Sequence, residues 1–257
     1  MLPGIDDGAP DMATSLEMAR IAVEDGITIT ACTPHITPSV YDNEGVGIHA
    51  AICALQAELN AAQIPLRLVA GADAHLAPDL GDGLASGRVP SLNGSRYFLF
   101  EPPHHVAPAR LDVFASELID RGYVPLLTHP ERLTWIEEHY DTMQRMAAAG
   151  AWMQITAGSL TGRFGRRPRY WAERMLDDGI VHVLATDAHN LGNRAPRLAE
   201  GRDAVAQRLG EDEATHMVLT RPQGVLDNTP PDQLPPCRRD TKRPRSGGLL
   251  RRLFKGS

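Results

Sequence analysis

The chain has 257 residues, enough for one large α/β domain. It contains no apolar run near the ~20 residues of a membrane-spanning helix, and Met1–Gly4 lacks the basic and apolar parts of a signal peptide. The net charge of −6 combines a basic segment from residue 237 onward (+7) with an acidic body, which argues against nucleic-acid binding by the folded part. The three cysteines have no regular spacing, so we expect reduced thiols in a cytoplasmic protein.

The first 120 residues contain several stretches with helical patterns. Residues 1–10 are rich in turn formers. Thr14 and Glu17 have capping-box spacing and predict a helix that continues to about Asp25. The long connection over residues 36–47 has the length of a functional lid. Apolar residues at helical spacing predict two packed helix faces, formed by Ile48, Ile52, Leu55 and Leu59 and by Leu111, Phe114, Leu118 and Ile119.

Six short apolar stretches read as buried strands, and each is followed at once by polar or turn residues. They cover residues 28–32, 66–70, 97–100, 124–127, 152–155 and 181–185. Helical stretches separate them, and Gly26, Gly122, Gly150 and Gly179 each stand one or two residues before a strand, where a left-handed helix cap is expected. The alternation predicts a parallel (β/α) barrel, in which functional groups gather at the C-terminal ends of the strands.

The residues that follow these strands are mostly potential metal ligands. The sixth strand stops at Asp187 and His189. A single Asp-Ala-His turn would be read as a helix cap, but five further strands repeat the arrangement. We therefore expect an enzyme with a multi-metal site. The donors are carboxylates and imidazoles without a thiolate, which favours Mn²⁺, Fe or Zn²⁺ over copper.

Two basic segments have competing interpretations. Residues 159–171 carry four arginines beside aromatic residues and are either an anion-receiving loop or a solvated loop or subunit contact. The segment 229–257 is rich in proline and then in basic residues, which predicts a disordered tail. Residues 249–255 suggest, as a minor hypothesis, a weak contact with a membrane surface. Cys237 and Arg243 have the spacing of a cysteine phosphatase motif, but the glycine-free loop between them argues for coincidence.

Five motifs in order resemble one family. These are Ile5-Asp-Asp-Gly8, Thr33-Pro-His35, Phe100-Glu101, Thr128-His-Pro-Glu-Arg132 and Ala185-Thr-Asp-Ala-His-Asn-Leu-Gly192. Together they resemble the metal-dependent protein tyrosine phosphatases of bacterial capsule and exopolysaccharide loci, within the polymerase-and-histidinol-phosphatase (PHP) superfamily. The resemblance covers residues 1–228 and implies an α/β fold, a distorted TIM-like (β/α) barrel of the PHP type, with up to three metal ions, most often Mn²⁺.

The resemblance also implies roles for individual residues. Asp7, His35 and His189 match the ligands of one metal ion. Asp73, Glu101 and His129 match those of a second, and Asp187 matches a ligand of the third. Arg132 and Arg194 match positions where arginine holds the phosphate, and His129 is grouped with them as a catalytic residue. Arginine suits this task because its planar fork binds two oxygens at once.

One part of the family pattern is missing. The family opens with a strand that carries His-x-His, whereas this chain begins at the segment after it. Two metal ligands and one barrel strand are therefore absent from the chain, and a barrel without that strand keeps open edges. Either Met1 is an internal methionine of a longer protein, or the chain is an impaired homologue. The first interpretation is favoured because the other ligand positions still hold competent side chains.

The implied reaction is hydrolysis of phosphotyrosine by a metal-activated hydroxide, without a covalent enzyme intermediate. The expected partner is a phosphotyrosyl protein such as a tyrosine autokinase of exopolysaccharide biosynthesis. The alternatives are a small phosphoester such as histidinol phosphate, or an impaired homologue that serves as a binding protein. His104 and His105 are candidate proton donors or extra ligands, with surface histidines as the commoner outcome, and His75 is a weaker candidate.

Overall fold

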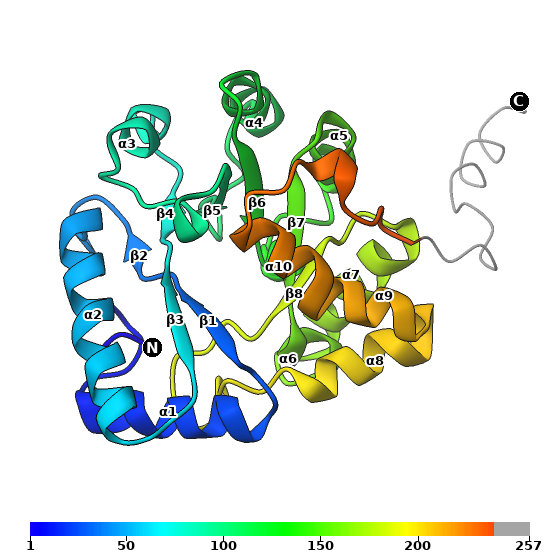
Figure 1. The fold of residues 1–257 in the computed structure, drawn as a ribbon. Coiled ribbons are helices and arrows are strands. Elements are labelled where there is room, and N and C mark those ends of the chain that lie inside the picture. The colour runs from blue at the N-terminus through cyan, green and yellow to red at the C-terminus, as the bar shows by residue number, and fades with distance from the viewer. Residues whose placement is uncertain (239–257) are drawn as a thin grey trace, which may run out of the picture.

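The structure, a computed structural model, describes residues 1–238 and has eight parallel strands in that part of the chain (Figure 1). The strands are β1 (Ile29–Cys32), β2 (His35–Ile36), β3 (Arg67–Ala70), β4 (Asp73–His75), β5 (Tyr97–Glu101), β6 (Val124–Thr128), β7 (Trp152–Thr156) and β8 (Val183–Ala185). The longer helices are α1 (Met12–Glu24), α2 (Gly45–Ala61), α4 (Leu111–Asp120), α5 (Tyr140–Ala149), α7 (Arg166–Asp178) and α8 (Ala199–Leu209). Shorter ones are α3 (Leu80–Ser86), α6 (Ala157–Leu160), α9 (Glu211–Thr215) and α10 (Arg221–Leu226), with single turns η1 (Leu92–Gly94), η2 (Pro130–Arg132), η3 (His216–Thr220) and η4 (Pro231–Gln233). None of the helices among these described residues is long and apolar enough to cross a membrane.

The strand order is that of an incompletely closed barrel. Six strands pair in the order β2-β4-β5-β6-β7-β8, while β1 pairs with β3 alone. The first two predicted strands break after Cys32 and Ala70, and after two residues each the chain forms a further short strand, β2 and β4 respectively. Within residues 1–238, the outer edges of β1 and β8 have no strand partner. The predicted α/β barrel is confirmed as a fold class, and it is open between these two strands.

Alternating side chains divide the sheet into two faces. Phe98, Phe100, Leu127 and Met153 belong to the large core beneath the surrounding helices. Tyr97, Leu99, Leu126, Trp152 and Val183 form a second cluster on the inner face. Because the side-chain period of a strand is two, Glu101 and Thr128 continue the inner face at the C-terminal ends of β5 and β6. The same alternation that builds the apolar inner cluster therefore also points polar groups into the barrel mouth.

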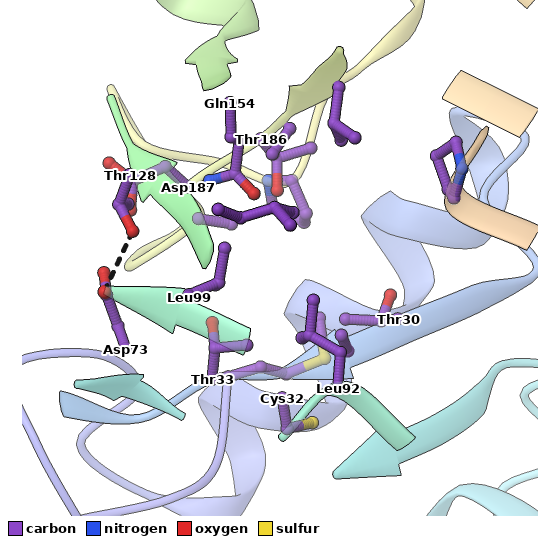
Figure 2. A pocket seen from close by; sticks show the side chains of 18 of the residues that line it. Thr30, Cys32, Thr33, Asp73, Leu92, Leu99, Thr128, Gln154, Thr186 and Asp187 are labelled. Atoms are coloured by element: carbon purple, nitrogen blue, oxygen red, sulfur yellow. Dashed lines mark hydrogen bonds between the residues drawn. The ribbon is translucent and has the colours of Figure 1, made fainter. Parts of the chain in front are cut away.

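A cavity of about 250 Å³ lies at the open side of the barrel. Consecutive residues of β1 and β8 line it, together with inward-facing Leu99, Leu126 and Gln154 (Figure 2). Asp73 and Thr128 stand at its polar end. The cavity therefore leads from an apolar floor to the carboxylates at the strand ends.

Two local expectations are corrected. Helix α1 begins at Met12 rather than at Thr14, because the Asp11 side chain accepts a hydrogen bond from the Thr14 N–H at 2.8 Å and acts as the N-cap. The sixth predicted strand is β8, which begins at Val183, two residues later than predicted. His182 stacks on Trp152 and accepts a hydrogen bond from the Met153 N–H through Nδ1, as befits a structural histidine.

The segment after residue 228 is ordered where it is described, unlike the predicted tail. The Tyr97 hydroxyl donates to the Thr229 carbonyl, and the fully buried Arg221 donates to the carbonyls of Pro235 and Pro236. Backbone carbonyls of residues 229–236 therefore hold this segment against the domain, because they accept hydrogen bonds from a buried guanidinium and from a phenol. The remainder of the predicted tail, Arg243 and residues 249–257 included, lies outside the described residues, and the domain limit at residue 228 stays a prediction.

Helix α8 packs against α6 at a glycine, which gives a test of the core. A Cβ at Gly201 would stand 2.5 Å from Cβ and 2.8 Å from Cα of Ala157, whereas a Cβ at Gly47 would meet nothing within 4 Å. Each glycine is the third residue of its helix. Gly201→Ala should lower the free energy of unfolding by about 1–3 kcal/mol through overpacking. The control Gly47→Ala should raise it by about 0.5 kcal/mol. Urea denaturation measures both, and equal effects would contradict the close packing.

Candidate metal centre

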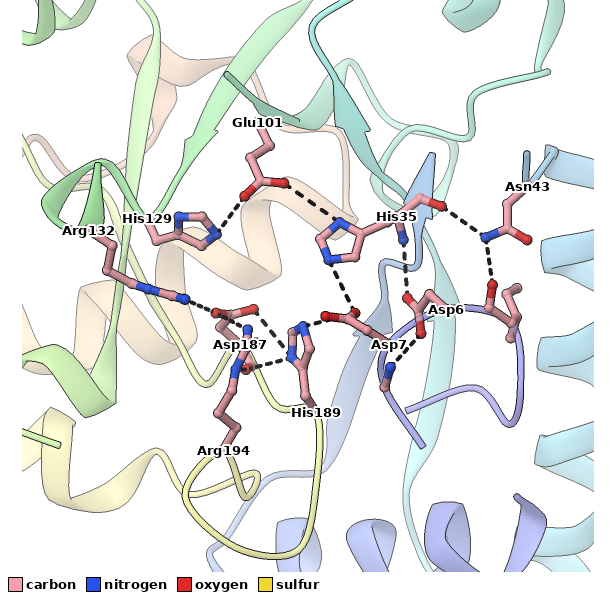
Figure 3. Close-up of polar contacts among 12 residues, drawn as sticks. Asp6, Asp7, His35, Asn43, Glu101, His129, Arg132, Asp187, His189 and Arg194 are labelled. Carbon is pink, nitrogen blue, oxygen red and sulfur yellow. Dashed lines mark hydrogen bonds and ion pairs between the residues drawn. The ribbon is translucent and has the colours of Figure 1, made fainter. Parts of the chain in front are cut away.

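Asp7 and two histidines form the first group of donors. Oδ1 of Asp7 is 3.5 Å from Nε2 of His35 and 3.4 Å from Nε2 of His189 (Figure 3). Asp7 precedes α1, His35 opens β2 and His189 follows β8. The fold therefore brings the predicted trio together from three distant parts of the chain, close enough to share one ion.

Two residues that the sequence did not single out hold this group in place. Asp6 accepts hydrogen bonds from the N–H of His35 at 3.2 Å and of Gly8 at 2.9 Å. The Asn43 amide donates to the carbonyls of Ile5 and His35 at 3.0 and 2.9 Å. The segment that carries Asp7 is thereby tied to β2. The Asp-Asp pair was a visible signal, whereas Asn43 lies in a loop that only the fold brings here.

Glu101 lies between two imidazoles at the end of β5. Its Oε1 is 3.2 Å from Nε2 of His129, and its Oε2 is 3.7 Å from Nδ1 of His35. Burial raises the pKa of Glu101, but the hydrogen bond and charge of His129 outweigh it and hold the pKa below the ordinary value. For His129, burial lowers the pKa, while Glu101 and Asp187 raise it above its usual range. Glu101 and His129 therefore form a buried ion pair.

Asp73 is the most deeply buried of the predicted carboxylate ligands. Thr128 donates a hydrogen bond of 2.9 Å to its Oδ1. Burial, and then repulsion from Glu101, raise the pKa of Asp73 to about 7. Asp73, Glu101 and His35 form a second group of donors close enough to share an ion. His129, which the sequence assigned to this group, is linked to it through Glu101, so its assignment stays a prediction.

Asp187 is held by both predicted phosphate-binding arginines. Arg132 and Arg194 donate to its Oδ2, the latter at 2.6 Å, while its Oδ1 is 3.7 Å from Nδ1 of His189. Burial raises the pKa of Asp187, but His129, Arg194 and other cationic groups outweigh it and hold the pKa below its usual value. The ring of Phe164 supports Arg132, whose guanidinium carbon is 4.7 Å from the ring centroid. Both arginines are therefore at the site, where they neutralise a carboxylate.

Two of the site residues have a left-handed backbone. The φ angles of His129 and Asp187 are 35° and 49°. Such values are costly for residues with a side chain and persist only where the surroundings fix them. His129 directly follows β6 and Asp187 is the second residue after β8, so both strained residues stand at the barrel mouth.

Glu131, which the sequence analysis did not assign, anchors the strained turn. Its buried Oε1 accepts hydrogen bonds from the Thr156 N–H at 2.8 Å and from the Ser159 hydroxyl at 2.7 Å. Burial raises its pKa. Among the described residues, its Oε2 and the Thr156 hydroxyl have no hydrogen-bond partner. Glu131 therefore ties η2, the turn that follows His129 and ends at Arg132, to β7 and α6.

The remaining candidate histidines lie at the margin. The His104 ring is 6.4 Å from that of His129, and His105 contacts His104 at 4.8 Å. His75 lines a separate cavity of about 240 Å³ beside Tyr41.

The predicted arginine-rich loop is instead the end of α6, a short connection and the start of α7. Three of its four arginines have partners within the chain, which disfavours the interpretation as an anion-receiving loop. Arg163 pairs with Glu200 and Arg169 with Glu173. Arg167 donates to the carbonyls of Leu133 and Thr134.

The donor set fits divalent cations. Two atoms that bind one ion at about 2.1 Å lie about 3 Å apart, and the contacts of Asp7 and Glu101 with their histidines span 3.2 to 3.7 Å. The buried Nδ1 of His129 has no partner within residues 1–238. Burial and then repulsion from Glu101 raise the pKa of Asp73, and a bound cation would offset both effects. Oxygen and imidazole donors suit Mn²⁺, Fe and Zn²⁺.

The pKa of Asp73 predicts a pH dependence of metal binding. Because its pKa is about 7, Asp73 is protonated at lower pH, and a metal ion must displace that proton. The affinity for Mn²⁺ should fall as the pH is lowered from 8 to 6. Calorimetry at pH 6 in buffers of different ionisation enthalpy measures the protons released. On binding Mn²⁺, the variant Asp73→Asn should release about one proton fewer than the wild type. An unchanged number of released protons would contradict the assignment of Asp73 as a metal ligand.

The anchoring role of Glu131 is also testable. Glu131→Ala should lower the melting temperature by several degrees and weaken inhibition by inorganic phosphate, because Arg132 loses its support. Glu131→Gln, which keeps the accepting oxygen, should restore both. Differential scanning calorimetry and phosphate inhibition constants report these effects. Equal behaviour of the two variants would show that the hydrogen bonds of Oε1 do not matter.

Comparisons with known proteins place this geometry in context. Residues 1–227 match the family model described as "Capsular polysaccharide synthesis, CpsB/CapC". Tyrosine-protein phosphatase YwqE of Bacillus subtilis is 33% identical over 236 residues, covering 92% of each chain. Tyrosine-protein phosphatase CpsB of Streptococcus agalactiae is 23% identical and covers 87% of this chain and 94% of that protein.

A solved structure agrees with these matches. Its description reads "Crystal structures of YwqE from Bacillus subtilis and CpsB from Streptococcus pneumoniae, unique metal-dependent tyrosine phosphatases". It superposes with a TM-score of 0.84 at 32% identity and covers 89% of this chain and 92% of that chain. With a family model that spans residues 1–227 and relatives matched over most of their length, the chain belongs to the CpsB/CapC family of capsular polysaccharide synthesis proteins.

Proposed function

We propose that this chain is a metal-dependent protein-tyrosine phosphatase that hydrolyses phosphotyrosine in a protein. Two groups of donors carry the proposal. Asp7, His35 and His189 lie close enough to share one ion, and His35 also lies close enough to Asp73 and Glu101 to share another. The relatives named as tyrosine-protein phosphatases support the substrate class over a small phosphoester such as histidinol phosphate. The description of the superposed structure as metal-dependent supports the chemistry.

The donor groups would hold the metal ions in two neighbouring positions. Asp7, His35 and His189 would hold one ion, and Asp73 and Glu101 would contribute to the next. When bound, such ions polarise the phosphoryl oxygens and lower the pKa of water so that a nucleophile exists near neutral pH. Asp6 and Asn43 keep the Asp7 segment against β2, so the donors are positioned before substrate binds.

Arg132 and Arg194 would orient the phosphoryl group. Each guanidinium already faces Asp187 at the barrel mouth, and a planar fork can hold two phosphate oxygens at once. If each guanidinium gave up part of its contact with Asp187 and bound the substrate instead, the phosphate would lie among the metal-binding groups. His129 lies beside this group, with its Nε2 3.2 Å from Oε1 of Glu101, and that carboxylate raises the pKa of the imidazole.

A cysteine nucleophile is disfavoured. Burial raises the pKa of the Cys32 thiol to about 11, so its thiolate is scarce at neutral pH. Cys53 is exposed on α2, and the Cys237 thiol contacts the Val181 carbonyl before the N-terminal end of β8. Among these three cysteines, none is placed as an activated nucleophile at the strand ends.

The finer assignments extend the proposal. Mn²⁺ is the proposed metal among the three ions that the donors suit, and the choice follows the family resemblance of the sequence. A tyrosine autokinase of capsule or exopolysaccharide synthesis is the proposed substrate, in keeping with the family description. The predicted cytoplasmic location and the predicted absence of nucleic-acid binding stay predictions.

A phosphatase assay with a phosphotyrosyl peptide tests the function. Chelation should abolish turnover and added Mn²⁺ should restore it, because the carboxylates need cations to bind phosphate. Alkylation of the thiols should leave the rate unchanged. The opposite pattern, with turnover lost on alkylation and kept in chelator, would refute the metal mechanism. Preferential hydrolysis of histidinol phosphate would favour the alternative substrate.

A further inference from the structure

Arg132 is held at the barrel mouth in a way that leaves most of its hydrogen-bond donors unused. Its side chain is only 18% exposed, and within residues 1–238 its one side-chain hydrogen bond runs from Nη1 to Asp187 (Figure 3). A guanidinium carries five N–H donors on three nitrogens. The Nε and Nη2 groups of Arg132 therefore remain available to a ligand.

Arg221 shows how the same protein holds an arginine whose task is structural. It is fully buried, and its Nε, Nη1 and Nη2 donate to the backbone carbonyls of Pro235, His182 and Pro236 respectively. Every nitrogen of that guanidinium thus has a partner. Arg132 has no comparable set of acceptors, so its side chain depends on a contact of another kind.

That contact is the ring of Phe164. The guanidinium carbon of Arg132 lies 4.7 Å from the ring centroid. A cation over an aromatic face is attracted by the negative charge of the π system. Such a contact fixes the guanidinium without supplying an oxygen acceptor that would compete with phosphate for its N–H groups.

Phe164 is not used to build the hydrophobic core. Phe98 and Phe100 are buried in the core and Phe114 packs against it. The half-buried Phe164, in contrast, belongs to neither of the two apolar clusters in the described part of the chain. An aromatic side chain that packs on a site arginine instead of the core indicates a role at the site.

The short connection between α6 and α7 fixes the ring. Gly162 and Gly165, on either side of Phe164, have φ angles of 80° and 93°, which glycine adopts without strain. The Gly165 N–H donates to the Gly162 carbonyl at 2.9 Å and closes the turn. A Cβ at Gly158 would stand 2.7 Å from Cε2 of Phe164. The ring is therefore in close contact with α6 as well as with Arg132.

We propose that Phe164 is a positioning residue for phosphate binding, whose ring holds the Arg132 guanidinium in place while N–H groups turn from Asp187 to the phosphoryl group. This inference rests on the proposed function and deepens it. Without the ring, the guanidinium would sample more rotamers. The phosphate would then have to order it on binding, which lowers the affinity.

The affinity of the Mn²⁺-loaded protein for inorganic phosphate tests the positioning role. Phe164→Leu keeps an apolar side chain but removes the ring, and calorimetry should show about fivefold weaker binding. Phe164→Tyr keeps the ring and should bind phosphate like the wild type. The control Tyr170→Leu, which removes a 55%-exposed ring from α7, should do the same. An unchanged affinity in Phe164→Leu would overturn the inference.

A double-mutant cycle shows whether the ring acts through Arg132. In an Arg132→Ala background, Phe164→Leu should cause no further loss of phosphate affinity, because the group that the ring holds is gone. An equal loss in both backgrounds would mean that the ring supports the site as a whole, and the positioning role would be wrong.

The contact can also be observed directly, without turnover, in the protein loaded with diamagnetic Zn²⁺. The ring current of Phe164 shifts the Nε–H resonance of Arg132, which is assigned by its disappearance in Arg132→Ala. This resonance should move in Phe164→Leu and stay near its wild-type position in Phe164→Tyr. A resonance that does not respond to the loss of the ring would contradict the contact.

These measurements separate the inference from the proposed function. A wild-type protein that hydrolyses no phosphotyrosyl peptide would refute the function, whereas the loss of phosphate affinity in Phe164→Leu would still support the positioning role. If Arg132→Ala binds phosphate as tightly as the wild type, the positioning role is refuted even though the peptide is hydrolysed.

Discussion

Repulsion among carboxylates at the barrel mouth is the constraint on which the rest of the site depends. Asp7, Glu101 and Asp187 meet within a few ångströms of shared histidines, and Asp73 is buried beside them. Such a group is costly unless positive charge compensates it. His129 compensates Glu101, and two arginines compensate Asp187. For Asp73, burial and repulsion from Glu101 outweigh His129 and His35 and keep its pKa raised. On the proposed function, cations and phosphate would bind where the protein already balances charge.

The barrel explains how so many acids can be placed together. Side-chain alternation leaves the lower inner face apolar, with Tyr97, Leu126 and Trp152 packed there, and reserves the strand ends for polar groups. Two turns with strained backbone, at His129 and Asp187, stand at the barrel mouth. The hydrogen bonds of Glu131 hold one of these turns from behind. The packed apolar face thus lies below the site, and part of the backbone strain lies in two residues of the site itself.

The arrangement also explains a division of labour around the mouth. On the proposed function, the recessed donors and arginines would recognise a phosphate, which small and large substrates share. Discrimination between substrates has to come from groups outside the recess, because only these meet the remainder of the substrate. The loops after the strands are free to vary in this role, since the sheet and helices carry the stability.

Much of the fold was legible in the sequence because its signals are local. Six apolar stretches that end in ligands gave the strands within about two residues, and the repeated pattern predicted a parallel barrel. The predicted ligands, Asp73 and His189 among them, meet at the mouth because parallel strands share their C-terminal edge. The capping of α1 by Asp11 and the ordered contacts of residues 229–236 were missed, since they depend on which of several competent groups is nearer.

The sequence by itself determined which residue types stand at the end of each strand, and therefore the fold class and the chemistry of the donors. Only the tertiary structure decided how those donors are grouped. It joined His35 to both Asp7 and Glu101, and it paired Arg132 and Arg194 with Asp187. It also brought Asn43 and Glu131 into supporting roles. Local patterns depend on neighbours along the chain, whereas these partnerships depend on distances between loops that are set by how the whole barrel packs.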